Sequence, residues 1–327
     1  MNSTHPARPV RGLALAAALH KAPWLWSVGG ALLVGVAAMM TFGATTAGNM
    51  LSAASAFVVF TVLVGLGQML VVTSGPGNID LSIPAAISLS GGVAMHVMGA
   101  RDGALLPGLA AALGVGAAIG FFNYALIRAL RIPPIIATLS SSFVLQSIAI
   151  SLGRGSAAPP PLLENFALSH VAGVSSLAFV ALAATLAVAV VLFRLVAGRS
   201  LSAVGQNPRA ANLAGVRVER VRCATYVSCS VLVALAAVLL AAFSGGATLD
   251  MGADYMLLSV AVVVIGGTQV SGGRASPTGV WGAACFLFLI NALLNASGTG
   301  AGVRAIVYGA LIIGVTTIAG GSPAARR

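Results

Sequence analysis

Long apolar runs alternate with short polar segments along almost the whole chain. A helix needs about 20 mostly apolar residues to cross the hydrocarbon core of a bilayer, and ten runs approach this length. The pattern predicts an all-α, polytopic integral membrane protein with ten transmembrane helices. The predicted spans are 24–43, 50–73, 83–100, 104–127, 133–152, 173–193, 223–244, 255–272, 277–296 and 301–320.

These spans form one transmembrane domain, residues 24–320, between a short N-terminal tail (1–23) and a short C-terminal tail (321–327). The first run follows Arg8, Arg11 and Lys21, which resembles the basic start of a signal peptide. The run is long for a signal peptide and has no convincing cleavage site. We interpret it as an uncleaved first helix.

The basic residues predict how the chain is oriented. With the N-terminus inside and ten crossings, 14 of the 17 Lys and Arg residues fall in the inner segments 1–23, 74–82, 128–132, 194–222, 273–276 and 321–327. The positive-inside rule predicts this asymmetry, so both termini are expected to be cytoplasmic. Four acidic residues fall on the outer side: Asp102, Glu164, Asp250 and Asp254.

Composition narrows the class of protein further. Only 7% of the residues are charged, whereas a soluble domain carries about 25%, so a soluble enzyme is excluded. Hydrophobic residues make up 58% of the chain, which excludes a disordered protein. The net charge of +11 is not gathered into one aromatic-rich patch, so we expect the lipid bilayer and not nucleic acid as the partner.

The longest inner segment, 194–222, contains a pattern typical of a short helix. Asn207 suits the N-cap, Pro208 suits the first helical position, and Gly215 suits the stop. A capped helix between two spans is more than a tight turn requires. We therefore expect this cytoplasmic loop to have a role of its own.

Catalytic motifs are missing from the sequence. It contains no phosphate-binding loop, and its four histidines are scattered singly, so we predict no catalytic residues, no metal site and no ATP hydrolysis by this chain. The middle of nearly every span is free of charge, which disfavours an ion-driven carrier. Sodium sites made of carbonyl groups would leave no such trace.

Asp80, at the edge of a span, is the main exception. It could be a proton or substrate ligand, or it could accept backbone N–H bonds before the helix that starts near Pro84, and we favour the second interpretation. A glycine-rich segment between two late spans has two interpretations of equal weight, an irregular backbone lining a gate or a simple turn. Its residues are Gly266, Gly267, Thr268, Gly272 and Gly273. Segments 71–92 and 263–282 also resemble each other weakly, as the two halves of a transporter do.

Four motifs resemble those of one family. They are GNIDLSIPAAISLSG (77–91), PPIIATLSS (133–141), VGQNPRAANLAGVRVERVR (204–222) and VAVVVIGGTQVSGGRASPTGVWGA (260–283). Their order, over about residues 50–320, resembles the permease subunits of bacterial ABC importers for ribose, xylose and galactose, and more distantly the branched-chain amino acid permeases. Asn78, Pro84 and Ala275 stand where that family has glycine.

The resemblance implies a multi-pass protein of the bacterial inner membrane that imports a monosaccharide or similar small polar solute. It implies a permease pair docked on cytoplasmic ABC ATPase subunits, which use ATP and Mg, and fed by a periplasmic substrate-binding protein. Coupling to the ATPase would involve Gly205, Asn207, Ala210, Ala211 and Gly215. The translocation path or gate would involve Asp80, Ser82, Gly266, Gly267, Thr268, Gly272 and Gly273.

Other functions stay open at this point. The solute could be a branched-chain amino acid, a nucleoside or an autoinducer. A different mechanism, an ion-coupled secondary transporter, is less favoured because the spans lack ionisable residues. A membrane enzyme is the weakest alternative, since no catalytic cluster is present in the sequence.

Overall fold

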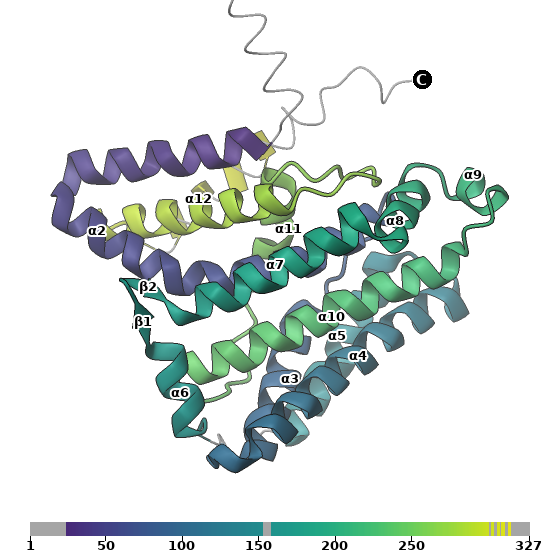
Figure 1. Cartoon of the computed structure of the whole chain (residues 1–327), viewed down its shortest axis with the longest axis horizontal. Coiled ribbons are helices and arrows are strands. Elements are labelled where there is room, and N and C mark those ends of the chain that lie inside the picture. Colours follow the sequence, from purple (N-terminus) through teal and green to yellow (C-terminus); the bar gives the residue numbers. More distant parts are fainter. Residues whose placement is uncertain are drawn as a thin grey trace, which may run out of the picture.

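A computed structural model describes residues 24–152 and 158–300, together with positions 302–303, 306–307, 309–310 and 313–314. Helices dominate the described residues (Figure 1). Their bounds are α2 Trp24–Thr73, α3 Ile83–Met98, α4 Leu105–Leu130, α5 Pro134–Leu152, α6 Pro161–Leu168, α7 Ser176–Arg194, α8 Val196–Gln206, α9 Pro208–Leu213, α10 Val218–Phe243, α11 Tyr255–Ile265 and α12 Pro277–Ala296. A 3₁₀ turn, η1 (Asp102–Ala104), precedes α4, and β1 (His170–Val171) pairs antiparallel with β2 (Val174–Ser175).

Several helices have the length and composition of membrane spans. Within the described residues, six segments qualify: α2, η1 with α4, α5, α7, α10 and α12. An all-α polytopic membrane protein is therefore confirmed. The predicted span 301–320 and both tails lie largely or wholly outside the described residues, so the count of ten spans and the cytoplasmic termini stay predictions.

Two predicted spans, 24–43 and 50–73, fall within the single element α2. This helix is broken at Gly43, whose φ of 81° and ψ of 166° are not helical. Figure 1 shows the chain bending sharply within α2, so that its two arms form separate layers. Glycine reaches this positive φ without the steric clash that a Cβ atom causes.

The predicted span 255–272 is wrong in its second half. Helix α11 ends at Ile265 and has 11 residues, so at 1.5 Å per residue it covers about half of a core about 30 Å thick. The backbone then passes through positive φ values at Gly267, Gly272 and Gly273. Gly266 and Gly267 end the helix, although the apolar run continues around them.

The second arm of α2, from Val58 to Thr73, lies at the centre of the molecule and is buried throughout. Gly65 contacts Val262 of α11 and Val280 of α12, and Gly67 contacts the backbone of α10. Small residues allow helices in membranes to approach this closely. The central arm is therefore packed against protein on all sides.

The outer helices expose apolar side chains instead. Leu106 on α4, Phe143 on α5 and Phe193 on α7 are 75%, 69% and 63% exposed. Such a surface is unfavourable in water but matches the hydrocarbon interior of a bilayer. These helices present the lipid-facing side of the fold.

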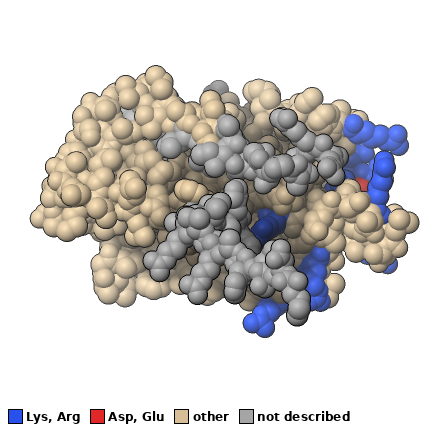
Figure 2. Space-filling model, turned by 90° about the horizontal axis from the view of Figure 1, so that it is seen from above, with Lys and Arg blue, Asp and Glu red and all other residues tan. Residues whose placement is uncertain are grey.

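Basic side chains gather at one end of the molecule in the view of Figure 2. In Figure 1 this end holds α9, the end of α4 and the start of α10. Arginines of these elements are Arg128, Arg209, Arg217, Arg220 and Arg222. All of them belong to the segments that the charge pattern assigns to the inner side.

Candidate functional site

Most of the segment between α2 and α3, residues 74–82, is buried where the sequence predicts an inner loop, and only Pro76 and Gly77 are exposed. Ser74, Asn78, Asp80 and Ser82 are all less than 9% exposed. The segment is not helical, so its polar backbone must find partners inside the protein. It therefore folds back among the helices instead of covering their ends.

Asp80 lies at the end of this segment with its carboxylate fully engaged. Its Oδ1 accepts the backbone N–H of Ser82 at 2.8 Å and the Ser82 hydroxyl at 2.6 Å. The Asn123 side-chain amide from α4 donates to the Ser82 hydroxyl oxygen at 2.7 Å and lies 3.4 Å from Asp80 Oδ2. As predicted, Asp80 accepts a backbone N–H before α3, although the N-cap itself is Ser82.

Two further polar side chains complete this arrangement. The Oε1 atom of Gln68, from the central arm of α2, accepts the backbone N–H of Asp80 at 3.3 Å. The hydroxyl of Thr138, on α5, accepts the backbone N–H of Leu81 at 3.0 Å. We call Gln68, Asp80, Ser82, Asn123 and Thr138 the Asp80 cluster, and it joins α2, α4 and α5 through the 74–82 segment.

The Asp80 cluster still has hydrogen-bonding capacity to spare. Gln68 Nε2 and Asn123 Oδ1 are buried and have no hydrogen-bond partner among the described residues. A buried donor and acceptor of this kind can bind the hydroxyls of a polar solute or ordered water. Sequence reasoning missed Gln68, Asn123 and Thr138, although the first two are amides within otherwise apolar runs.

A second site brings together residues that the sequence assigned to different roles. A Cβ atom on Gly205 of α8 would collide with the carbonyl oxygen of Thr73 and the backbone nitrogen of Gly273. The N–H of Gly273 donates to that same carbonyl at 2.8 Å, and Gly272 lies against the Cα of Gly75. We call Thr73, Gly75, Gly205, Gly272 and Gly273 the glycine junction.

The remaining residues of the predicted gate lie in other surroundings. Gly266 packs against the backbone of Gly279, where α11 meets α12. Gly267 forms a turn at a φ of 79°. Thr268 is buried, and its hydroxyl has no partner among the described residues. Close helix packing therefore explains Gly266, while Gly272 and Gly273 belong to the glycine junction.

The short helix predicted after Asn207 is present as α9. The Asn207 side chain accepts the N–H groups of Arg209 and Ala210, both at 3.0 Å, and Pro208 is the first helical residue. Gly215 follows the helix with a φ of 84°, the left-handed conformation in which glycine commonly ends helices. The predicted cap and stop are thus confirmed.

The residues predicted to couple to an ATPase differ in their exposure to solvent. Asn207, Ala210 and Gly215 are exposed, whereas Gly205 and Ala211 are buried. The exposed residues can touch a partner directly. Gly205 instead connects α8 to the 74–82 segment through the glycine junction.

Comparison with known proteins finds permease components of transport systems. The sequence profile of the family described as "Branched-chain amino acid transport system / permease component" matches residues 24–316. The chain is 29% identical to the ribose import permease protein RbsC of Escherichia coli K12 over 258 residues, which cover 77% of this chain and 79% of that protein. It is 27% identical to the autoinducer 2 import system permease protein LsrD of Photorhabdus laumondii over 262 residues, 77% of each chain. No solved structure matches.

Proposed function

The chain belongs to the family of branched-chain amino acid transport system permease components, and on this basis we propose that it forms the translocation pathway of an ATP-binding-cassette importer. As a member of that family, it is a non-catalytic, multi-pass subunit of the bacterial inner membrane. We further propose that it pairs with a second permease, docks on cytoplasmic ATPase subunits that use ATP and Mg, and receives solute from a periplasmic binding protein.

A ribose-like monosaccharide is the solute we propose first. The observation that carries this choice is the similarity to the ribose import permease over 77% of the chain. The similarity to autoinducer 2 import permeases favours a second candidate, an autoinducer-2-type solute. Branched-chain amino acids and nucleosides remain the further candidates of the same class.

Coupling to ATP hydrolysis would pass through α8 and α9. Helix α9 lies at the basic end of the molecule, where Asn207, Ala210 and Gly215 are open to a partner. Movement of α8 would reach Thr73 directly, because Gly205 touches it. It would reach Gly75 through Gly272, which lies against both Gly205 and Gly75. The glycine junction thus offers a continuous contact from the ATPase-facing helix to the 74–82 segment.

The Asp80 cluster lies at the far end of that same segment. We propose that its rearrangement opens or closes the path, with Asp80 and Ser82 holding the segment and the free groups of Gln68 and Asn123 facing the solute. Buried polar residues of membrane proteins are costly to retain and commonly mark such paths. Gly272 and Gly273 act at the other end, where the late glycine-rich segment touches α8.

Reconstitution in proteoliposomes tests this function. The permease is combined with a candidate ATPase and a candidate binding protein from the same organism, and uptake of labelled ribose is measured against competing unlabelled solutes. We expect uptake that requires all components and ATP, with one solute class competing. Uptake by the permease alone, driven by a proton or sodium gradient, would identify a secondary transporter and refute the proposal.

A further inference from the structure

A polar pocket opens at the basic end of the molecule, apart from α8 and α9. Its volume is about 340 Å³, and it lies between α4, α10 and the 74–82 segment. The side chains that matter for its chemistry are Asn78, Tyr124, Arg128, Arg131, Glu219 and Arg222. Three of these are arginines and one is acidic, so the lining is positively charged.

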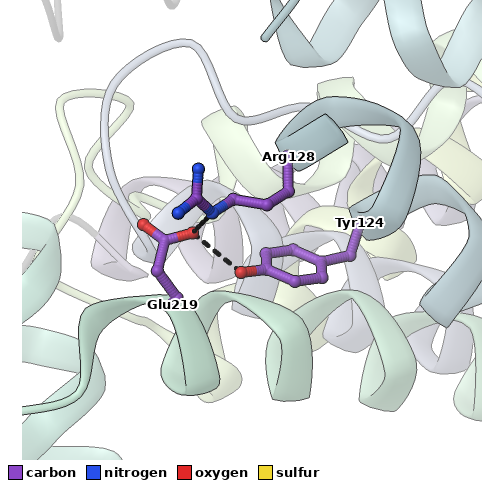
Figure 3. A network of polar contacts seen from close by, with 3 residues as sticks. All are labelled: Tyr124, Arg128 and Glu219. Atoms are coloured by element: carbon purple, nitrogen blue, oxygen red, sulfur yellow. Dashed lines mark hydrogen bonds and ion pairs between the residues drawn. The ribbon is translucent and has the colours of Figure 1, made fainter. Parts of the chain in front are cut away.

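The one carboxylate is already occupied by partners of its own. Glu219 Oε2 lies 3.1 Å from Arg128 Nε and accepts the Tyr124 hydroxyl at 2.8 Å (Figure 3). Both contacts join the last turns of α4 to the first turn of α10. Glu219 therefore offsets the charge of Arg128 and leaves two arginine charges in the pocket uncompensated.

Those two arginines are Arg131 and Arg222. Within the described residues, neither makes an ion pair with a carboxylate. Arg222 Nε is buried and has no hydrogen-bond partner there. A Cβ on Gly75 would lie 3.9 Å from Arg222 Nη2, so this guanidinium lies beside Gly75 of the 74–82 segment. A buried charged donor without a partner is unusual in a folded protein and indicates a ligand.

The backbone sets Arg131 in this position. It follows α4 with a φ of 54° and a ψ of 33°, a left-handed conformation that is unfavourable for a residue other than glycine. Residues held in such a conformation are over-represented at binding sites, where the surrounding structure compensates for the strain. The turn places Arg131 in the pocket lining beside Arg128.

We propose that this pocket binds a phosphate-bearing anion from the cytoplasmic side. A guanidinium presents several N–H donors in one plane and matches phosphate oxygens in pairs. A volume of about 340 Å³ accommodates a phosphate group and a small organic part, at the lower end of the range for ligand pockets. The phosphate belongs either to a small soluble metabolite or to a lipid headgroup.

The site goes beyond the proposed import function, because its arginines belong neither to α8 and α9 nor to the Asp80 cluster. The pocket, the glycine junction and the Asp80 cluster all use residues of the 74–82 segment. Pro76 and Asn78 of this segment form part of the pocket wall. An anion that bridges Arg222 and Arg131 would join α10 to the end of α4 beside Pro76 and Asn78 of this segment. A bound anion would therefore regulate the movement of the 74–82 segment that solute import requires.

Binding measurements on the full chain test this inference. The purified permease in phosphatidylcholine nanodiscs is titrated with inorganic phosphate by calorimetry at constant ionic strength. We expect R222Q and R131Q each to weaken binding by roughly tenfold or more, because each removes charge-assisted hydrogen bonds. R194Q serves as the matched control, since Arg194 is exposed at the end of α7 and does not line the pocket.

A parallel set of nanodiscs containing phosphatidic acid distinguishes the two sources of phosphate. Arg222-dependent binding of free phosphate supports a soluble ligand. Arg222-dependent enrichment of phosphatidic acid around the protein, without binding of free phosphate, supports a lipid headgroup. Equal binding by wild type, R222Q and R131Q, or no binding in either arm, overturns the proposal. A guanidinium-modifying reagent gives a further test. If Arg222 is protected from the reagent only when the ATPase is present, an acidic side chain of that partner is the occupant and the proposal is overturned.

Discussion

Replacing Gly205 with alanine should uncouple the ATPase from the permease. The added Cβ collides with the Thr73 carbonyl oxygen and the Gly273 nitrogen, and overpacking of this kind costs about 1–3 kcal/mol. Loss of the Gly273–Thr73 hydrogen bond adds about 0.5–1.5 kcal/mol. The higher helix propensity of alanine offsets less than about 1 kcal/mol of this cost, because Gly205 lies in the last turn of α8. The net destabilisation of about 0.5–4.5 kcal/mol falls on the glycine junction.

ATP hydrolysis by the reconstituted complex measures this effect. We expect stimulation by the loaded binding protein to fall about tenfold, the change that 1.4 kcal/mol produces, with the permease still inserted and monodisperse. Gly114→Ala is the matched control, because this exposed glycine in the middle of α4 has no atom near its Cβ position. Wild-type coupling in G205A would refute the role of the glycine junction.

Three further predictions concern the cluster, the cap and the energy source. D80A deprives the buried N–H and hydroxyl of Ser82 of their acceptor and should lower the free energy of unfolding by about 1–3 kcal/mol. The melting temperature in detergent should fall for D80A and fall less for D80N. Equal melting temperatures of D80A and wild type would contradict this. N207A removes the cap of α9, worth about 1 kcal/mol, and should reduce coupled ATP hydrolysis while N207D retains it; an unaffected N207A argues against a docking role. Uptake at constant ATP should withstand a proton ionophore, because the spans contain few ionisable residues, and collapse of uptake is the opposing result.

Local sequence signals predicted part of the fold well. Asn207, Pro208 and Gly215 act within a few residues of themselves, so their pattern alone predicted α9 and both its ends. Hydropathy likewise predicted most of the long helices. It failed after Ile265, because an average over an apolar run does not register that Gly266 and Gly267 end the helix.

The sites depended on contacts that no local pattern contains. Gly205 meets Thr73 and Gly273 only because three separate segments converge. Sequence reasoning therefore gave Gly205 and Gly273 different roles and gave Thr73 none. Asp80 was predicted to bind backbone N–H groups, and it does. Its burial beside Asn123 follows from the packing of α4 against the 74–82 segment, and residues so distant along the chain give no sign of this proximity.

The central arm of α2 also constrains how the protein is made. Its neighbours on α11 and α12 follow roughly 200 residues later in the chain, a delay of about 10–40 s at ordinary rates of synthesis. During that interval, lipid and the helices made earlier, such as α7 and α10, are the apolar surroundings open to Val58–Thr73. The arm's mostly apolar surface suits a lipid surrounding. Its one amide, Gln68, accepts the N–H of Asp80 only when the 74–82 segment has folded back. The central arm is therefore made well before all of the helices that finally enclose it.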